Sequence, residues 1–202
     1  TVFFTVKQDT TRMNLRAGVI NGPKNPQFSF TTILTGEIRD RDAELIAEYK
    51  NGKGETGVLL GVNARPLVGG RGKGDGLAFT LIPAEPIIAF RKFHFNENHN
   101  WIYLHKNMRV YANVDMWDDE GMGFRVHSVE GDTVSLQNID VEIRRIRLDE
   151  ITSVLPYFPE ITGLFSAEAH YIQTEKDLQL SAEASIDELT YERQRIGDVT
   201  RS

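Results

Sequence analysis

Apolar and polar residues alternate with a period of two along most of the chain. This alternation is typical of β-strands that have one buried face and one solvated face. The clearest runs cover residues 28–38, 58–64, 77–81, 108–117, 122–126, 139–144 and 178–187. The helices that join parallel strands are missing between these runs, so neighbouring strands are expected to pair antiparallel.

Short polar segments separate these runs at close intervals. Residues 51–54, 96–98, 118–121 and 130–132 are such segments, and they include the pairs Asn51-Gly52 and Gly131-Asp132. Pairs of this kind supply the positive φ angles of tight hairpins. The sequence therefore predicts an all-β fold, a long antiparallel meander of about ten or more strands. No linker interrupts the pattern, so residues 1–202 are predicted to form a single β-rich unit.

Residues 148–159 break the alternation. Their apolar positions follow helical spacing and are Ile151, Val154, Leu155 and Phe158. Asp149 is a candidate N-cap, and Pro156 stops a helix at about the preceding residue. The pattern predicts one short helix over about 149–155. A helix of this length is unstable alone, so it is expected to dock on the sheet with Ile151 buried.

The alternation also assigns side chains to the two faces of each strand. If the sheet curls into a trough, its interior is expected to be lined by Leu60, Val62, Leu77, Phe79, Val110, Val114, Phe124, Val126, Leu178 and Leu180. The opposite sides carry Arg109, Asn113, Arg125, Gln179 and Glu183. Two such sheets can also cover each other in a closed sandwich. Periodicity alone leaves both arrangements open.

Composition and charge narrow the functions that these strands can serve. The net charge of −6 argues against nucleic acid as a partner, because phosphate neutralisation needs a basic face. The absence of cysteine excludes disulfides, thiolate metal sites and a cysteine nucleophile. No apolar run approaches the roughly 18 residues of a membrane-spanning helix. Because the chain starts at Thr1 and stops just after a strand-like pattern, we expect it to be a segment of a longer protein.

Two polar clusters have the composition of chemical sites but fit structural roles better. Asp118, Asp119 and Glu120 precede Gly121 between two strand patterns, where a solvated turn is expected. The glycine-rich stretch 69–76 has no serine or threonine after its Gly-Lys pair and no helical pattern beyond it. It therefore does not match a phosphate-binding loop, and a hairpin loop is expected instead.

Two other constellations leave alternative functions open. His94 and His105 would face each other if residues 94–105 formed a symmetric hairpin, and a shared metal would then permit hydrolysis. Trp101, Tyr103, Trp117 and Tyr171 leave open a surface adhesion or glycan-binding β-sandwich domain. Exposed coplanar rings would favour sugar, whereas rings buried in a concavity would favour lipid.

The stretch from Leu148 to Val199 resembles the C-terminal region of the TamB family of bacterial envelope proteins, in its Bacteroidetes-like form. The matching segments are Leu148–Ile151, Leu155–Ala167, Ala182–Glu192 and Ile196-Gly197. In TamB and the related AsmA-like proteins, a leucine–proline–x–x–proline motif followed by glycine–leucine joins a helix to a strand. These segments span about a quarter of the chain, and the rest matches only in its long amphipathic strands.

The resemblance implies a protein anchored in the inner membrane of a Gram-negative bacterium and extending through the periplasm. Its β-rich body would curl into a β-taco with an apolar interior. Such proteins move phospholipid toward the outer membrane and cooperate with an outer-membrane barrel protein in envelope assembly. The family offers no catalytic residues, so we expect no enzymatic activity, no cofactor and no metal. The expected function is that of a lipid-conduit segment that holds acyl chains in its apolar groove.

Overall fold

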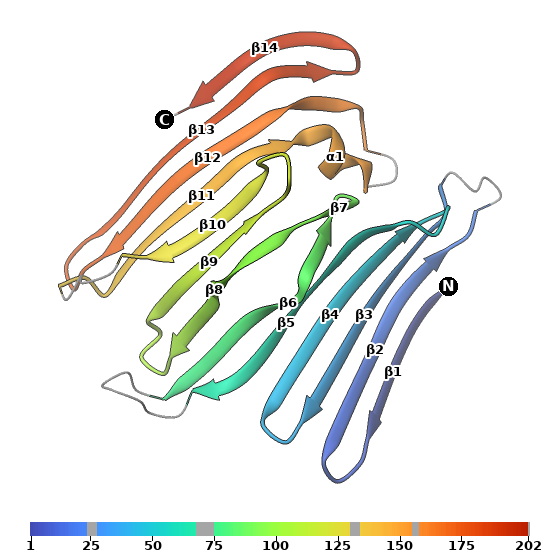
Figure 1. Cartoon of the computed structure of the whole chain (residues 1–202), viewed down its shortest axis with the longest axis vertical. Helices are drawn as coiled ribbons and strands as arrows, with labels where there is room; N and C mark the ends of the chain where they lie inside the picture. Colours follow the sequence, from blue (N-terminus) through green and yellow to red (C-terminus); the bar gives the residue numbers. More distant parts are fainter. Residues whose placement is uncertain (24–27, 68–74, 130–133, 155–157, 202) are drawn as a thin grey trace.

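The computed structural model describes residues 1–23, 28–67, 75–129, 134–154 and 158–201 (Figure 1). It contains one short helix, α1 (Leu148–Ser153), and fourteen strands. The strands are β1 (Val2–Gln8), β2 (Arg12–Asn21), β3 (Phe30–Arg39), β4 (Asp42–Asn51), β5 (Thr56–Leu67), β6 (Gly76–Ile88), β7 (Arg91–Lys92), β8 (His94–His105), β9 (Val110–Trp117), β10 (Gly123–Ser128), β11 (Gln137–Arg147), β12 (Ile161–Gln173), β13 (Leu178–Tyr191) and β14 (Gln194–Arg201).

All of these strands belong to one antiparallel sheet whose spatial order follows the chain. The order runs from β1 through β6, then β8 to β14, and β7 pairs with β6 beside this path. The predicted all-β antiparallel meander with one short helix is therefore confirmed. The sheet is a single open layer with two free edges, β1 and β14, rather than two packed layers.

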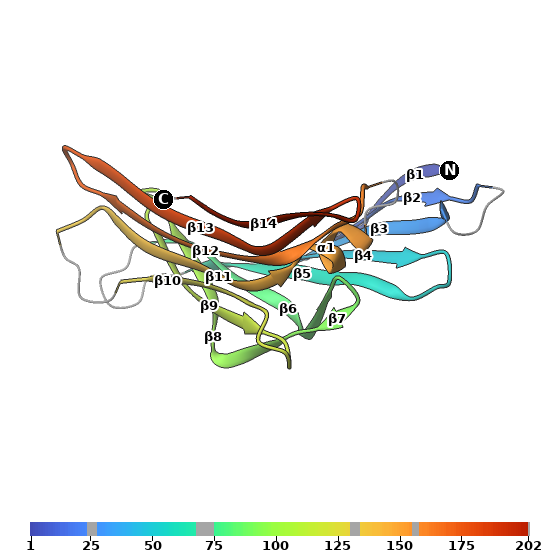
Figure 2. The ribbon, with the colours of Figure 1, turned by 90° about the horizontal axis from the view of Figure 1, so that it is seen from above.

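The sheet is curved into a trough. Figure 2 shows β8 and β9 at its base, β1 to β4 forming one wall and β12 to β14 the other. Ala112, Val114 and Met116, on one side of β9, are 2%, 1% and 6% exposed, whereas the residues that alternate with them are half-buried. Met116 packs with Phe93 and Met122 in a small buried cluster, whereas no second layer within the described residues covers Ala112 and Val114. The inward bend of the sheet therefore buries them, and their side is the concave one.

The two halves of the sheet meet at a narrow seam between β6 and β8. These strands pair over four residues, Gly76–Phe79 with Ile102–His105. Beyond this stretch the side chain of Asn100 takes the place of a paired strand. Its Nδ2 donates to the Leu81 carbonyl and its Oδ1 accepts from the Leu81 N–H, both at 2.9 Å. The amide side chain thus satisfies two backbone groups where the strands diverge.

The helix differs in detail from the sequence prediction. Residue Arg147 occupies the N-cap position without a side-chain cap, because β11 runs directly into α1. Asp149 is therefore not the N-cap. It lies in the first turn, where its negative charge interacts favourably with the positive end of the helix dipole. Its carboxylate accepts a hydrogen bond from Arg147 at 3.3 Å. The helix packs against β12 and β11, and the predicted end at Leu155 and Pro156 lies outside the described residues.

Ile151→Asp is expected to destabilise the protein by about 1 kcal/mol, because Ile151 is half-buried rather than buried as its spacing predicts. The shift of the urea unfolding midpoint measures this effect. Ser153→Asn, at an exposed position of the same helix, adds no charge, serves as the control and should leave the midpoint unchanged. A loss above about 3 kcal/mol would show that α1 is buried against the sheet to a greater extent than described.

Candidate functional site

The strand register shows which side chains share a face of the sheet. Residues directly opposite in an antiparallel ladder project to the same side. One row of neighbours crosses the whole sheet and consists of Gln8, Met13, Ile38, Ala43, Ala64, Phe79, Ile102, Ala112, Ser128, Ile139, Tyr171 and Leu180. We call the side that carries this row the apolar face. Because Ala112 belongs to it, the apolar face is the concave face of the trough.

The next row on the apolar face has the same character. In the N-terminal half it consists of Val6, Leu15, Gly36, Leu45, Val62 and Leu81. Across the seam it continues through Asn100, Val114, Val126, Val141, Ala169 and Ala182. The apolar surface therefore extends from one free edge of the sheet to the other, and the two rows contain no charged side chain.

All ten residues predicted to line the groove lie on the apolar face. Val114 and Val126 are direct cross-strand partners, and Leu77 and Val110 both pair with Leu104. Leu60 pairs with Ala47, Phe124 with Met116, and Leu178 with Gln173, which places them on the same side. Their exposure differs with position: Val114 is buried at the base, whereas Leu178 and Leu180 on the far wall are 63% and 66% exposed.

Large apolar side chains are exposed mainly along the two walls of the apolar face. The exposed set on this face comprises Val2, Phe4, Val6, Val19, Ile38, Leu45, Leu77, Leu178, Leu180 and Val199. Contiguous apolar surface of this kind marks a site of interaction with an apolar ligand, a membrane or another protein. Phe4, Val6 and Leu45 extend the predicted groove, because β1 and β4 lie outside the runs of alternation that predict strands.

The opposite side of the sheet, which we call the polar face, is lined by hydrophilic side chains. Its central row contains Lys7, Asn14, Glu37, Glu44, Asn63 and Thr80, and then Trp101, Asn113, His127, Asp140, His170 and Ser181. Four of the residues expected to face water, Asn113, Arg125, Gln179 and Glu183, lie on this face. Arg109 instead precedes β9, in the hairpin that follows β8.

The acidic segment 118–121 forms the predicted turn, but it is not a solvated tip throughout. Asp118 is 3% exposed, and its Oδ1 accepts the backbone N–H groups of Glu120 at 3.0 Å and Met122 at 2.7 Å. Arg91 donates to its other oxygen at 3.2 Å. The prediction of a solvated turn is wrong for Asp118, because the arginine that covers it comes from β7, 27 residues earlier in the chain.

Arg91 joins this turn to the helix. Its guanidinium also pairs with Glu120 at 2.9 Å and donates to Glu150 of α1 at 2.6 Å. The hydrogen bond from Arg91 lowers the pKa of the exposed Glu120 carboxyl, and the carboxylates together raise the pKa of Arg91. These acidic groups are thus engaged in holding β7, the turn and α1 together, which gives them a structural role.

The histidines considered for a shared metal are far apart. Both lie on β8, which continues through residues 96–98 where a turn was expected. On the neighbouring strand, His94 lies opposite Trp117 and His105 bonds to Arg109, so eight residues of strand, roughly 26 Å, separate the two histidines. His94 contacts Asp119 at 3.1 Å, while the ring of His105 is buried at 5.2 Å from that of Tyr111. The symmetric hairpin that the metal hypothesis requires is therefore absent from the described structure.

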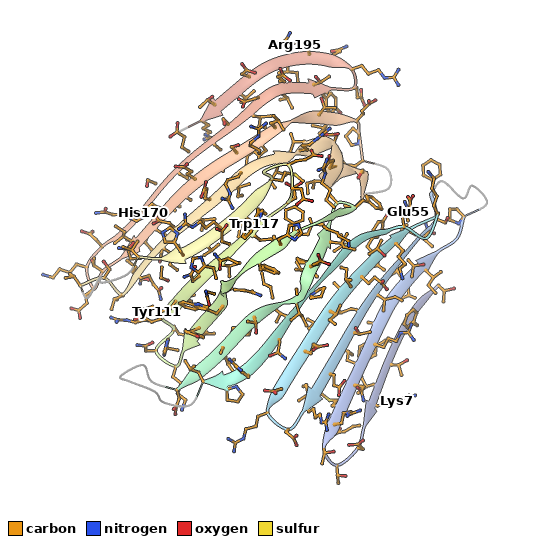
Figure 3. The ribbon with its side chains drawn as sticks, viewed as in Figure 1. Lys7, Glu55, Tyr111, Trp117, His170 and Arg195 are labelled. Atoms are coloured by element: carbon orange, nitrogen blue, oxygen red, sulfur yellow. The ribbon has the colours of Figure 1, made fainter. Side chains whose placement is uncertain are left out.

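The aromatic residues do not form one sugar-binding platform. Trp101 and Tyr103 stack on each other, with ring centroids 4.5 Å apart and planes 18° apart. They share the polar face with Trp117, which lies at the opposite end of β9 from Tyr111 (Figure 3). Tyr171 lies on the apolar face. The three polar-face rings also lie outside the concavity. The four aromatic residues therefore form neither the exposed coplanar platform expected for sugar nor the buried cluster expected for lipid.

A cluster on the polar face was missed by the sequence analysis. Asp140 of β11 contacts His127 of β10 at 3.2 Å through one oxygen and His170 of β12 through the other. The three residues line an open hollow of about 810 Å³ with Glu142, Glu168 and Glu183. Only the strand register reveals this cluster, since its members are far apart in sequence. Within the described residues, no group of three or more such side chains has the arrangement of a metal site.

Comparisons of the chain with protein families, with curated proteins and with solved structures find no match. Among the residues that the structure describes, no helix has the length and apolar character to span a membrane.

Proposed function

We propose that the chain is a non-enzymatic segment of a lipid conduit and carries phospholipid acyl chains on its apolar face. The observation that carries this proposal is the single-layer sheet, whose concave side stays apolar from edge to edge. A packed core would need a second layer over Phe4, Leu178 and Leu180, and the described residues supply none. An acyl chain is an apolar ligand that can cover such an elongated surface.

The expected binding free energy suits an acyl chain that moves along the apolar face rather than one that is held tightly. Burial of a methylene group is worth about 0.8 kcal/mol. An open trough shelters only one side of an acyl chain, so each methylene gains less than this amount. The two traced rows offer no charge for a phosphate head group, which leaves the lipid free to move along the face. Thirteen paired strands spaced at about 4.8 Å give a sheet roughly 60 Å wide, enough for several chains side by side.

The cellular setting of this proposal derives from the resemblance to the TamB family. In that setting the segment belongs to an inner-membrane-anchored protein of the periplasm, and an outer-membrane barrel protein is its partner. The curved, one-layered sheet with an apolar concave face is compatible with that role. The surface adhesion or glycan-binding alternative is less favoured, because its four aromatic residues are split between the two faces.

A photo-crosslinking residue is expected to capture lipid in cells when placed on the apolar face and not on the polar face. Adjacent positions form matched pairs: Phe79 with Thr80, Phe124 with Arg125, and Leu180 with Gln179. Each pair shares a strand and differs in the face that it occupies. We expect lipid adducts, measured by mass spectrometry, to be at least about tenfold more abundant at the first member. Equal capture within the pairs, or none at either position, would rule out lipid binding on this face.

A further inference from the structure

The two halves of the sheet are joined at the seam by few backbone contacts. We call β1 to β7 the N-terminal half and β8 to β14 the C-terminal half. At the seam end that includes Gly76 and His105, the halves share the four-residue ladder between β6 and β8. Toward α1, β6 and β8 share no further ladder in the described structure, and the side chain of Asn100 supplies the next link, to Leu81.

A second link between the halves is the chain itself. It crosses the seam at Phe93, between Lys92 of β7 and His94 of β8. Lys92 pairs with Ile87 in the N-terminal half, and His94 pairs with Trp117 in the C-terminal half. The ladder and Phe93 therefore lie at opposite ends of the seam. Together they define an axis along it, about which the halves can swing and change the angle between the two walls of the trough.

Ion pairs beside this axis oppose such a swing. Arg91 belongs to the N-terminal half, because β7 pairs with β6. Its guanidinium pairs with Asp118 at 3.2 Å and with Glu120 at 2.9 Å, and it donates to Glu150 at 2.6 Å. All three carboxylates belong to the C-terminal half, in the turn after β9 and in α1, and Figure 1 shows β7 beside α1. One arginine thus reaches across the seam to three acidic partners.

An apolar contact accompanies these ion pairs. Ile88 of β6 packs against the buried cluster of Phe93, Met116 and Met122. Met116 lies on β9 and Met122 lies directly before β10, so this contact also joins the two halves. We call the contacts of Arg91 and Ile88 with the C-terminal half the latch.

The latch can open without breaking a strand pair. It consists of side-chain contacts only, so its release leaves the ladder between β6 and β8 in place. The sheet is a single layer, and no second layer in the described structure braces one half against the other. The side chain of Glu120 is 59% exposed, so water reaches the ion pairs readily. A short ladder between two larger rigid parts is the arrangement of a hinge, in which a few residues at the ends of elements absorb the motion.

We infer that the two halves swing about the seam, so that the trough opens and closes, and that the latch holds it at the closed angle. Release of the latch moves the two walls apart, whereas the spacing of strands within each half is unchanged. The hinge is inferred from the strand pairing and the side-chain contacts alone. Its use, the admission of an acyl chain to the apolar face, rests on the lipid proposal.

Distances between spin labels test the hinge. The chain has no cysteine, so pairs of introduced cysteines carry the labels without competing sites. Glu44→Cys on β4 and Glu183→Cys on β13, both at exposed positions, form the between-half pair. Lys7→Cys on β1 and Asn63→Cys on β5 form the within-half pair. Double electron–electron resonance should give one narrow distance distribution for each pair when the latch is intact.

Arg91→Met should shift the between-half distribution to longer distances and broaden it, while the within-half distribution stays unchanged. Ile88→Ala removes the apolar part of the latch and should shift the between-half distribution in the same direction. It decides the test alone if circular dichroism shows that Arg91→Met has lost its sheet. Lys92→Met, whose side chain is 69% exposed, is the control and should change neither distribution.

Two results would overturn the inference. One is a between-half distance that stays the same in the folded latch variants, and the other is an equal change in both label pairs. The measurement does not involve lipid, so its failure leaves the photo-crosslinking test of the apolar face standing. In the same way, a failure of lipid capture does not alter the expected distances.

Discussion

Replacement of Arg91 by methionine is expected to lower the free energy of unfolding by about 3 kcal/mol. The Asp118 side chain is 2% exposed and that of Glu150 is 16% exposed, and both pair with Arg91. Methionine preserves most of the side-chain volume but leaves the buried Asp118 carboxylate without its cation, while Glu150 keeps only its ion pair with Arg147 at 3.1 Å. Arg91 links β7 both to the turn at 118–121 and to α1, so its loss should also loosen α1. Urea unfolding measures the change.

Lys92→Met is the matched control for Arg91→Met. Lys92 follows Arg91 in β7, but its side chain is 69% exposed and its pair with Glu85 spans 3.8 Å, so its loss should cost less than about 0.5 kcal/mol. The pH dependence gives a second readout. The pKa of Glu120 is lowered by Arg91, so this pair stabilises the fold at neutral pH and ceases to do so as the pH falls below the ordinary range of a glutamate. Arg91→Met should remove that part of the acid sensitivity, and similar losses for both variants would contradict the assigned role.

Gly76→Ala is expected to destabilise the protein by at least about 2 kcal/mol. Gly76 begins β6 at the seam, and a Cβ there would lie well inside 3.0 Å of the Leu104 carbonyl oxygen and the His105 Cα. Both contacts are with backbone, so the neighbouring strand must move. Movement at this point disturbs the four-residue pairing that joins the two halves of the sheet.

Gly22→Ala is the matched control for Gly76→Ala, because a Cβ at Gly22 would meet no atom within 4 Å. Its unfolding midpoint should stay within experimental error of the wild type. Amide hydrogen exchange adds a local readout: Gly76→Ala should speed exchange in β6 and β8 more than in β2 and β3. Uniform acceleration across the sheet would argue that the seam is not the weak point.

The fold class was predictable because the pleat imposes a period of two on any strand with one wet face. Single strands were harder to recognise. β4 alternates Ala43, Leu45, Ala47 and Tyr49 with polar residues, but Ile46 interrupts its polar side. The centre of β8 is polar and was interpreted as a turn. It remains a strand because both of its ends pair with β9, while a register irregularity between Phe95 and Asn100 absorbs the extra residues.

The candidate site was predictable strand by strand but not as a surface. Alternation placed Phe79 on one side of β6 and Leu180 on one side of β13. Their membership of one cross-strand row depends on the register of the strands between them. A closed sandwich would show the same alternation, so sequence periodicity cannot reveal that this face is uncovered. The ion pairs of Arg91 were also beyond prediction, because nothing local signals which distant carboxylates it meets.

The single-layer architecture also affects how the molecule can change its length. Each strand packs mainly against its two neighbours in the chain, and no central core is shared by all of them. In a two-layered domain, an added strand must fit the layer that it faces. Here a whole hairpin can be gained or lost within a wall, and only the two flanking ladders have to be rebuilt. The width of the sheet can therefore change in steps of two strands, while the alternation of apolar and polar side chains between its two faces is preserved.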